Sequence, residues 1–223
     1  DEVLIRAREE MLDWRGTGIS IMELSHRSEI FMQFLFELEQ KICKLMNIPK
    51  NYKVLFMQGG GQGQFAAVPM NFTGKNKNAD YFATGIWSDR AVGYAEKYCK
   101  VNVATKATKS NIPDKSTWQL NPNAAYAYYC PNETINGIMF SEIPDVGNVP
   151  LVADMTSSIM SNVIDVSEFG LVFAAAQKNL GQSGVALVIV RDDLLDQEQD
   201  ITPGIWSYKL QAKEHSLVNT VPV

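Results

Sequence analysis

The stretch KVLFMQGGGQGQFAAVPMNF, residues 53–72, decides the fold class predicted for this chain. An apolar run of strand length at 53–57 leads into a glycine cluster, and a second apolar run of helical length follows at 62–72. Glycines permit a tight turn between two such elements. A strand, a turn and a helix in this order are the repeating unit of α/β proteins, so the stretch predicts that class.

Similar apolar runs recur on both sides of this stretch. Those expected to form strands lie at 53–57, 81–84, 101–105, 125–130, 151–155, 171–176 and 184–191, and further helices are expected at 3–12, 28–46 and 88–99. The runs are apolar on both faces and the early ones alternate with helices, which favours a mostly parallel seven-stranded sheet flanked by helices. After Arg191 the pattern fades, so the remaining residues are expected to be loop with little core.

Composition narrows the class of protein. The chain has 223 residues and a formal charge of −5, so no basic excess is present to neutralise the phosphates of a nucleic acid. No apolar run approaches the length of a membrane-spanning helix, and no membrane association is expected. The three cysteines cannot all pair and show no CxxC spacing, which favours a reducing, cytoplasmic location. No metal site is predicted.

The glycine cluster is the first candidate functional site. Backbone N–H groups in a glycine-rich turn that opens a helix bind phosphate well. The cluster is not a Walker loop, because no Gly-Lys-Ser or Gly-Lys-Thr follows, and Gln64 replaces the last glycine of the dinucleotide-binding pattern. From the residues alone, a phosphate site and a plain strand-to-helix turn remain equally supported.

A carboxylate and an amine each follow a predicted strand. Asp154 ends the run at 151–155, and Lys178 comes directly after the run at 171–176. Taken singly, Asp154 could cap a turn and Lys178 could be an exposed loop residue. At the carboxyl end of a sheet, however, the lysine can act as an amine nucleophile and the aspartate can pair with a protonated pyridine nitrogen. Together with a phosphate cradle, the two indicate a pyridoxal-phosphate enzyme.

Several longer segments carry a specific resemblance. They are ISIMELSHRS (19–28), NYKVLFMQGGGQGQFAAVPMN (51–71), CPNETINGI (130–138), VADMTSS (152–158), FAAAQKNLGQSG (173–184) and IVRDDLL (189–195). In this order they make the chain resemble the phosphoserine aminotransferases, a class-V group of the fold-type-I pyridoxal-phosphate aminotransferases.

The resemblance implies a role for each matching residue. Lys178 is implied to bind the cofactor aldehyde and to shuttle the substrate α-proton, and Asp154 to pair with the cofactor ring nitrogen. Trp87 is implied to stack on the ring, and Thr134 to hydrogen-bond near its phenolic oxygen. The remaining implied contacts are the cofactor phosphate for Gly61, Gln62 and Gln177, the phosphate of the neighbouring subunit for Asn219 and Thr220, and the anionic substrate for His26 and Arg27.

The resemblance also implies an organisation and a reaction. Residues 1–223 correspond to the large, cofactor-binding domain, with its N-terminal start and the C-terminal small domain missing. The expected assembly is a homodimer with composite sites. The expected reaction is amino transfer from L-glutamate to 3-phosphohydroxypyruvate, giving O-phospho-L-serine and 2-oxoglutarate in serine biosynthesis. Two alternatives remain: another transaminase or lyase of the same fold, and a catalytically silent fragment.

Overall fold

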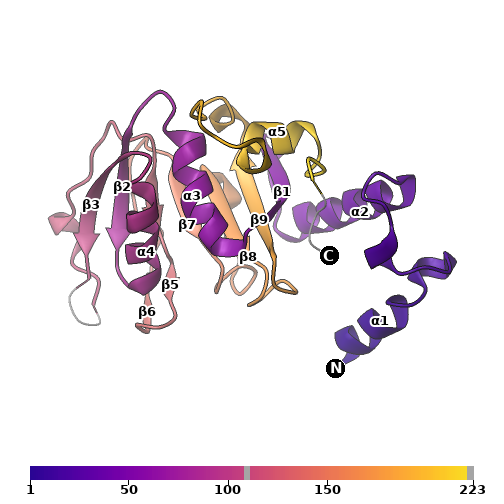
Figure 1. The fold of residues 1–223 in the computed structure, drawn as a ribbon. Helices are drawn as coiled ribbons and strands as arrows, with labels where there is room; N and C mark the ends of the chain where they lie inside the picture. The colour runs from indigo at the N-terminus through magenta and orange to yellow at the C-terminus, as the bar shows by residue number, and fades with distance from the viewer. Residues whose placement is uncertain (108–110, 220–223) are drawn as a thin grey trace.

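A seven-stranded sheet runs through the computed structural model, which describes residues 1–107 and 111–219 (Figure 1). Its strands are β1 (Tyr52–Gln58), β2 (Asn78–Ala83), β3 (Lys100–Lys106), β4 (Ala127–Tyr129), β7 (Leu151–Asp154), β8 (Leu171–Ala175) and β9 (Val185–Arg191). Their spatial order is β1-β9-β8-β7-β4-β2-β3. Neighbours are parallel from β8 to β3, and β9 is antiparallel to both β8 and β1. The mostly parallel sheet predicted from the sequence is confirmed.

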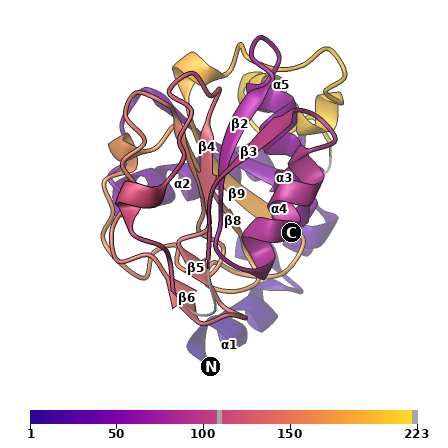
Figure 2. The ribbon, with the colours of Figure 1, turned by 90° about the vertical axis from the view of Figure 1, so that its left-hand side faces the viewer.

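The helices α2 (Glu29–Leu45), α3 (Gly60–Phe72) and α4 (Ile86–Ala95) cover the two faces of this sheet. The helix α1 (Glu2–Glu10) precedes α2, α5 (Tyr208–Lys213) lies near the C-terminus, and a two-stranded ribbon of β5 (Asn132–Glu133) and β6 (Ile138–Met139) follows β4. Figure 2 shows α3 and α4 on one side of the sheet and α2 on the other. No helix in the described residues is long and apolar enough to cross a membrane.

Alternation along the strands divides the core in two. In β1, Val54 and Phe56 pack into the cluster under α2, whereas Leu55 and Met57 pack into the cluster under α3 and α4. Successive strand side chains point to opposite faces, so a strand covered on both sides needs apolar residues at every position. This requirement explains why the strand runs read as continuous apolar segments rather than as alternating ones.

The helix α2 forms as the sequence predicts. Ser28 precedes it, and the Ser28 hydroxyl accepts a hydrogen bond from the backbone N–H of Phe31 at 3.3 Å. The helix ends at Leu45, and Asn47 follows with a φ of 50° in the left-handed region. Serine at the start and asparagine beyond the end are typical capping residues.

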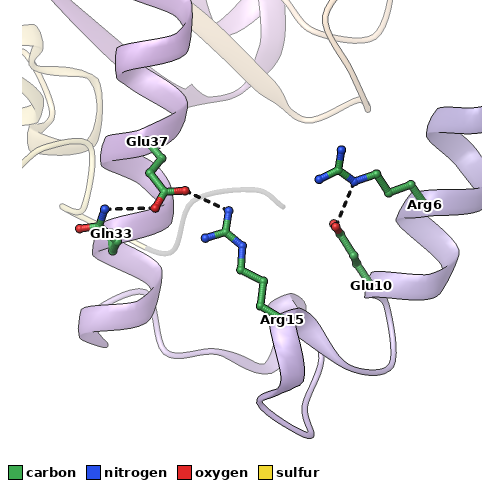
Figure 3. A network of polar contacts seen from close by, with 5 residues as sticks. All are labelled: Arg6, Glu10, Arg15, Gln33 and Glu37. Atoms are coloured by element: carbon green, nitrogen blue, oxygen red, sulfur yellow. Dashed lines mark hydrogen bonds and ion pairs between the residues drawn. The ribbon is translucent and has the colours of Figure 1, made fainter.

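The segment before α2 is attached by the buried Trp14, whose ring packs edge-on against Phe34 of α2 with centroids 5.2 Å apart, and by polar contacts (Figure 3). The helix α1 buries none of its residues, and Arg6 and Glu10 pair only within it, at 3.1 Å. Farther along, the Arg15 guanidinium donates to Glu37 of α2 at 2.9 Å, and the Gln33 amide donates to the same carboxylate at 3.1 Å. These contacts, that of Arg15 foremost, lower the pKa of Glu37. Because these polar pairs are solvent-exposed, they add little to the attachment that Trp14 provides.

The expectation of a loop with little core after Arg191 is wrong. Residues 208–213 form α5, which contacts β1, and its first residue Tyr208 is fully buried beside Phe72. The Ser207 hydroxyl caps α5 by accepting the N–H of Leu210 at 3.1 Å. A helix of six residues is too short for its apolar spacing to reveal it in the sequence.

Asn71 of α3 connects this C-terminal segment to the core, which leads to a prediction. Its amide donates to the carbonyls of Ala67 and Trp206 at 2.8 and 2.7 Å and accepts the N–H of Tyr208 at 2.8 Å. Asn71→Ala leaves buried polar groups unpaired, so the free energy of unfolding in urea should fall by about 3 kcal/mol. The exposed Asn162 provides the control, since Asn162→Ala should change it by less than about 0.5 kcal/mol. Equal effects would contradict the anchoring role of Asn71.

Candidate functional site

A cavity of about 260 Å³ lies at the carboxyl edge of the sheet. The strands β1, β2, β4, β7 and β8 point the same way, and the segment after each of them supplies lining residues. The cavity is lined by Gly59, Gly60, Gly61, Gln62, Phe65, Trp87, Cys130, Asn132, Asp154, Thr156, Ser157, Gln177 and Lys178. Ligand sites in open parallel sheets lie at this edge.

A second, larger hollow is chemically different. This groove of about 420 Å³ lies between α2 and the ends of β1, β8 and β9, and its lining is apolar apart from Lys41. It offers no carboxylate and no cluster of hydrogen-bond donors. The cavity at the carboxyl edge is the candidate reaction site because it holds both the buried Asp154 carboxylate and the Lys178 amine, although other hollows in the described residues are larger.

The N-terminus of α3 forms one wall of the cavity. Gly59 and Gly60 adopt φ values of 89° and 57°, a left-handed conformation that side chains disfavour. The helical ladder begins with the bond from the Gly63 N–H to the Gly59 carbonyl at 2.9 Å. The N–H groups of Gly60, Gly61 and Gln62 precede that bond and carry the positive end of the helix dipole. This wall is suited to an anion.

Asp154 supplies a buried carboxylate at the end of β7. Its Oδ1 accepts both the N–H and the hydroxyl of Thr156, at 3.0 and 2.6 Å, whereas Oδ2 accepts one long bond from the Tyr128 hydroxyl at 3.4 Å. Burial raises the pKa of Asp154; the bonds from Thr156 and the nearby charge of Lys178 oppose that rise, and Glu133 adds to it. Oδ2 is the oxygen with capacity left for a cationic donor in the cavity.

Lys178, Thr134 and Trp87 form a connected group at the cavity. The hydroxyl oxygen of Thr134 accepts the Lys178 ammonium at 3.1 Å and the indole N–H of Trp87 at 3.2 Å. The lysine Nζ lies 5.6 Å from the centroid of the Trp87 ring. A hydroxyl that accepts twice keeps its own proton for donation, so Thr134 can donate to a third atom.

A family model matches nearly the whole chain. The model of the family described as aminotransferase class-V matches residues 1–216. The chain belongs to this family. The similarity therefore includes the sheet, the cavity and nearly every residue that the structure describes.

Individual relatives are similar over the same range. A phosphoserine aminotransferase of Acinetobacter baylyi is 53% identical over 222 residues, which is 98% of this chain and 62% of that relative. A solved phosphoserine aminotransferase of Bacillus circulans superposes with a TM-score of 0.93 at 43% identity, over 99% of this chain and 62% of the other. One from Trichomonas vaginalis, solved with PLP bound, gives 0.94 at 39% identity, over 99% and 63%. The chain thus spans about 62% of the length of the curated relatives that it matches.

In this class-V aminotransferase chain, most of the predicted cofactor residues share one cavity. Gly61, Gln62, Trp87, Asp154, Gln177 and Lys178 line it, and Thr134 touches two of them. The side-chain amide oxygen of Gln62 accepts a hydrogen bond from the Tyr94 hydroxyl at 3.0 Å, which leaves the side-chain NH₂ group of Gln62 for a ligand. The reasoning from strand ends therefore placed distant residues at one edge, and their individual roles remain predictions.

The other predicted residues are not brought to the cavity. His26 and Arg27 precede α2, and neither belongs to the lining that the described residues form. Asn219 is exposed and is likewise no part of that lining. Thr220 lies outside the described residues. The roles predicted for these residues in substrate binding and at a neighbouring subunit remain predictions.

Some residues of the site were not anticipated from the sequence. Thr156 holds Asp154, and Glu133 accepts backbone N–H groups at the start of α4. Asn132 and Ser157 bond each other across the cavity wall at 3.1 Å. A signal was present for two of them, because Glu133 and Asn132 directly precede Thr134 in the motif PNET. Their partners lie on α4 and in the turn after β7 and cannot be identified from spacing.

The burial of Asp154 leads to a pH-dependent prediction for the cofactor-free protein. Its raised pKa means that the folded state keeps this proton to a higher pH than the unfolded chain does. Between the pKa of this carboxyl in the unfolded chain and its raised pKa in the folded state, the folded state binds more protons. In that pH range this carboxyl therefore makes the free energy of unfolding fall as pH rises. Asp154→Asn keeps an oxygen for Thr156 and removes the titration. As the pH rises from acid to neutral, the free energy of unfolding of Asp154→Asn should therefore increase relative to that of the wild type.

Urea denaturation of both proteins across that pH range measures the difference. The remaining carboxylates contribute to both curves alike, so they cancel in the comparison. Two curves that stay parallel from acid to neutral pH would show that the native environment does not shift the Asp154 carboxyl.

Proposed function

We propose that this chain is the cofactor-binding part of a phosphoserine aminotransferase that uses pyridoxal phosphate. The observation that carries the proposal is one cavity holding a buried carboxylate, an amine and a helix N-terminus. The whole enzyme transfers the amino group of L-glutamate to 3-phosphohydroxypyruvate, which yields O-phospho-L-serine and 2-oxoglutarate for serine biosynthesis. Relatives named phosphoserine aminotransferase at 47–53% identity support this choice among transaminases.

The cavity fits the three functional ends of the cofactor. Asp154 Oδ2, buried and held by a single long bond, suits a protonated ring nitrogen. The N–H groups at the start of α3 suit a phosphate, with the side chains of Gln62 and Gln177 beside them. Lys178 Nζ, within hydrogen-bond reach of Thr134, suits the aldehyde carbon. Pyridoxal phosphate, when bound, supplies an electron sink for the substrate α-carbon.

The residues of this chain then have separate tasks. Lys178 binds the cofactor covalently and moves the proton at the substrate α-carbon, with Nζ as the base. Asp154 keeps the ring nitrogen protonated, because an ionised carboxylate favours the adjacent positive charge. Trp87 covers one face of the ring, and the Thr134 hydroxyl donates to the phenolic oxygen. His26 and Arg27 are assigned to the anionic substrate, because an arginine fork suits a carboxylate or a phosphate.

Assembly and location are part of the same proposal. Asn219 is exposed and does not contribute to the cavity of its own chain, which supports its assignment, with Thr220, to the phosphate of a neighbouring subunit. Such composite sites require a two-fold homodimer. Residues 1–223 are assigned to the large domain, and the site is completed by a small domain. Three free cysteines support a cytoplasmic location.

A lyase of the desulfurase type is less well supported. That chemistry needs a mobile, reactive cysteine at the cofactor. Cys130 is the cysteine that lines the cavity in the described residues, but it is buried, and burial raises the pKa of its thiol well above the ordinary value. A thiol in this environment is a poor nucleophile.

Covalent trapping tests the cofactor assignment. After incubation with pyridoxal phosphate and reduction with borohydride, peptide mapping should find a pyridoxyl group on Lys178. Lys178→Ala should abolish the adduct and slow amino transfer at least about 10³-fold, because one residue provides both the covalent bond and the base. The matched control is Lys209→Ala, since Lys209 pairs with Asp196 on the surface at 2.7 Å. An adduct on another lysine would overturn the assignment, and no adduct would support a silent fragment.

Substrate specificity needs a separate measurement. In single-turnover assays, the enzyme loaded by L-glutamate should transfer its amino group to 3-phosphohydroxypyruvate at least about tenfold faster than to pyruvate, because a bound phosphate adds charge-assisted hydrogen bonds. Pyruvate differs only in lacking the phosphate ester group at C3 and so serves as the matched substrate. Equal rates with both acceptors would exclude phosphoserine specificity and favour another transaminase.

A further inference from the structure

A second buried carboxylate, that of Glu133, lies beside the cavity without lining it. Its side chain is fully buried. One carboxylate oxygen accepts the backbone N–H of Trp87 at 3.0 Å, and the other accepts the N–H of Ser88 at 2.8 Å. Both donors belong to the first turn of α4. Glu133 therefore caps the start of a helix whose two donor residues lie 46 and 45 positions earlier in the sequence.

The start of α4 depends on caps from elsewhere. The residue at its N-cap position is Gly85, which has no side chain to accept a hydrogen bond. The N–H of Ile86 is instead bound by the Asn136 side chain at 2.9 Å, and Glu133 binds the next two N–H groups. Asn136 and Glu133 both belong to the short segment of β5 and β6. A carboxylate at a helix N-terminus is favoured further by the helix dipole.

Gly85 leaves the space that Glu133 occupies. A Cβ at position 85 would lie 2.6–2.7 Å from Cγ, Cδ and Oε2 of Glu133, which no real side chain tolerates. The φ of Gly85 is −174°, an extended value open to any residue, so the requirement for glycine here is spatial. The carboxylate is thus packed directly against the turn that leads into Trp87.

Two consecutive residues of one strand segment hold both ends of Trp87. Glu133 binds its backbone N–H at 3.0 Å, and Thr134 accepts its indole N–H at 3.2 Å. Fixing the backbone and the far edge of the ring leaves the side chain little freedom to tilt. The plane of the ring at the cavity is then determined by this segment and not by α4 alone.

We propose that Glu133 is a positioning residue that sets the plane of the Trp87 ring against the bound cofactor. The inference rests on the proposed function, because it concerns how the cofactor is gripped at that site. Glu133 acts through Trp87 and touches neither cofactor nor substrate. A stacking residue held at one angle binds a flat ring better than one that samples several, since less freedom is lost on binding.

Glu133→Gln tests the inference in the enzyme loaded with pyridoxal phosphate. Glutamine keeps the size but offers one acceptor, and its NH₂ group opposes the second backbone N–H. We expect the cofactor dissociation constant to rise about five- to tenfold. We also expect the visible circular dichroism per bound cofactor to change. In a Trp87→Phe background, Glu133→Gln should have a much smaller effect on the cofactor dissociation constant. Phenylalanine has no indole N–H for Thr134 to accept, so its ring is no longer fixed at both ends.

Asp80→Asn is the matched control. Asp80 is also a buried carboxylate that accepts a backbone N–H, that of Asn121 at 2.6 Å, and it does not line the cavity. Asp80→Asn should lower the free energy of unfolding without altering the visible dichroism per bound cofactor. If Glu133→Gln leaves the dichroism and the dissociation constant as in wild type, or weakens binding equally in the Trp87→Phe background, the positioning role is wrong.

Two further measurements keep the test decisive. If Glu133→Gln does not fold, Glu133→Asp retains the charge but loses the reach to both N–H groups, and it should show the same effects in weaker form. If the wild type takes up no cofactor, the proposed function fails. The near-ultraviolet dichroism of Trp87, obtained as wild type minus Trp87→Phe, then tests ring orientation alone. It should change with Glu133→Gln, and an unchanged signal would overturn the inference.

Discussion

The burial of the Asp154 carboxylate at the end of β7 is the constraint on which the rest of the site depends. A desolvated carboxylate is unfavourable unless hydrogen bonds or a nearby positive charge compensate it. Thr156 compensates one oxygen completely, and Lys178 contributes charge from across the cavity. Under the proposed function, a protonated ring nitrogen at the second oxygen would complete this arrangement. The proposed function therefore couples stability and cofactor affinity through this one side chain.

Glu133 shows a different solution to the same physical problem. Both of its oxygens receive backbone N–H groups at a helix N-terminus, so its charge is compensated within the protein. The two carboxylates thus divide the work at one edge of the sheet: one is satisfied and holds an element in place, and the other keeps capacity for a ligand. Parallel strands make this division possible, because their carboxyl ends lie beside the N-termini of the following helices.

Much of this architecture could be predicted from residue order. The seven strands, the capped helix α2 and the strand-end positions of Asp154 and Lys178 all follow from apolar runs and local capping signals. Other features depend on contacts between distant segments. The short helix α5 is stabilised by Asn71 of α3, and Glu133 reads as an ordinary surface residue until its partners on α4 are known. Neither contact leaves a periodic signal in the chain.

The class of fold, the family resemblance and the residue types available for catalysis could all be predicted from residue order, because they depend on local patterning and on motifs of a few residues. The tertiary structure alone decided which of those residues meet. It joined Gly61, Asp154 and Lys178 in one cavity and left His26 and Arg27 outside its lining. The physical reason is that hydrogen bonds and burial act over a few ångströms, whereas the groups concerned are tens of residues apart along the chain.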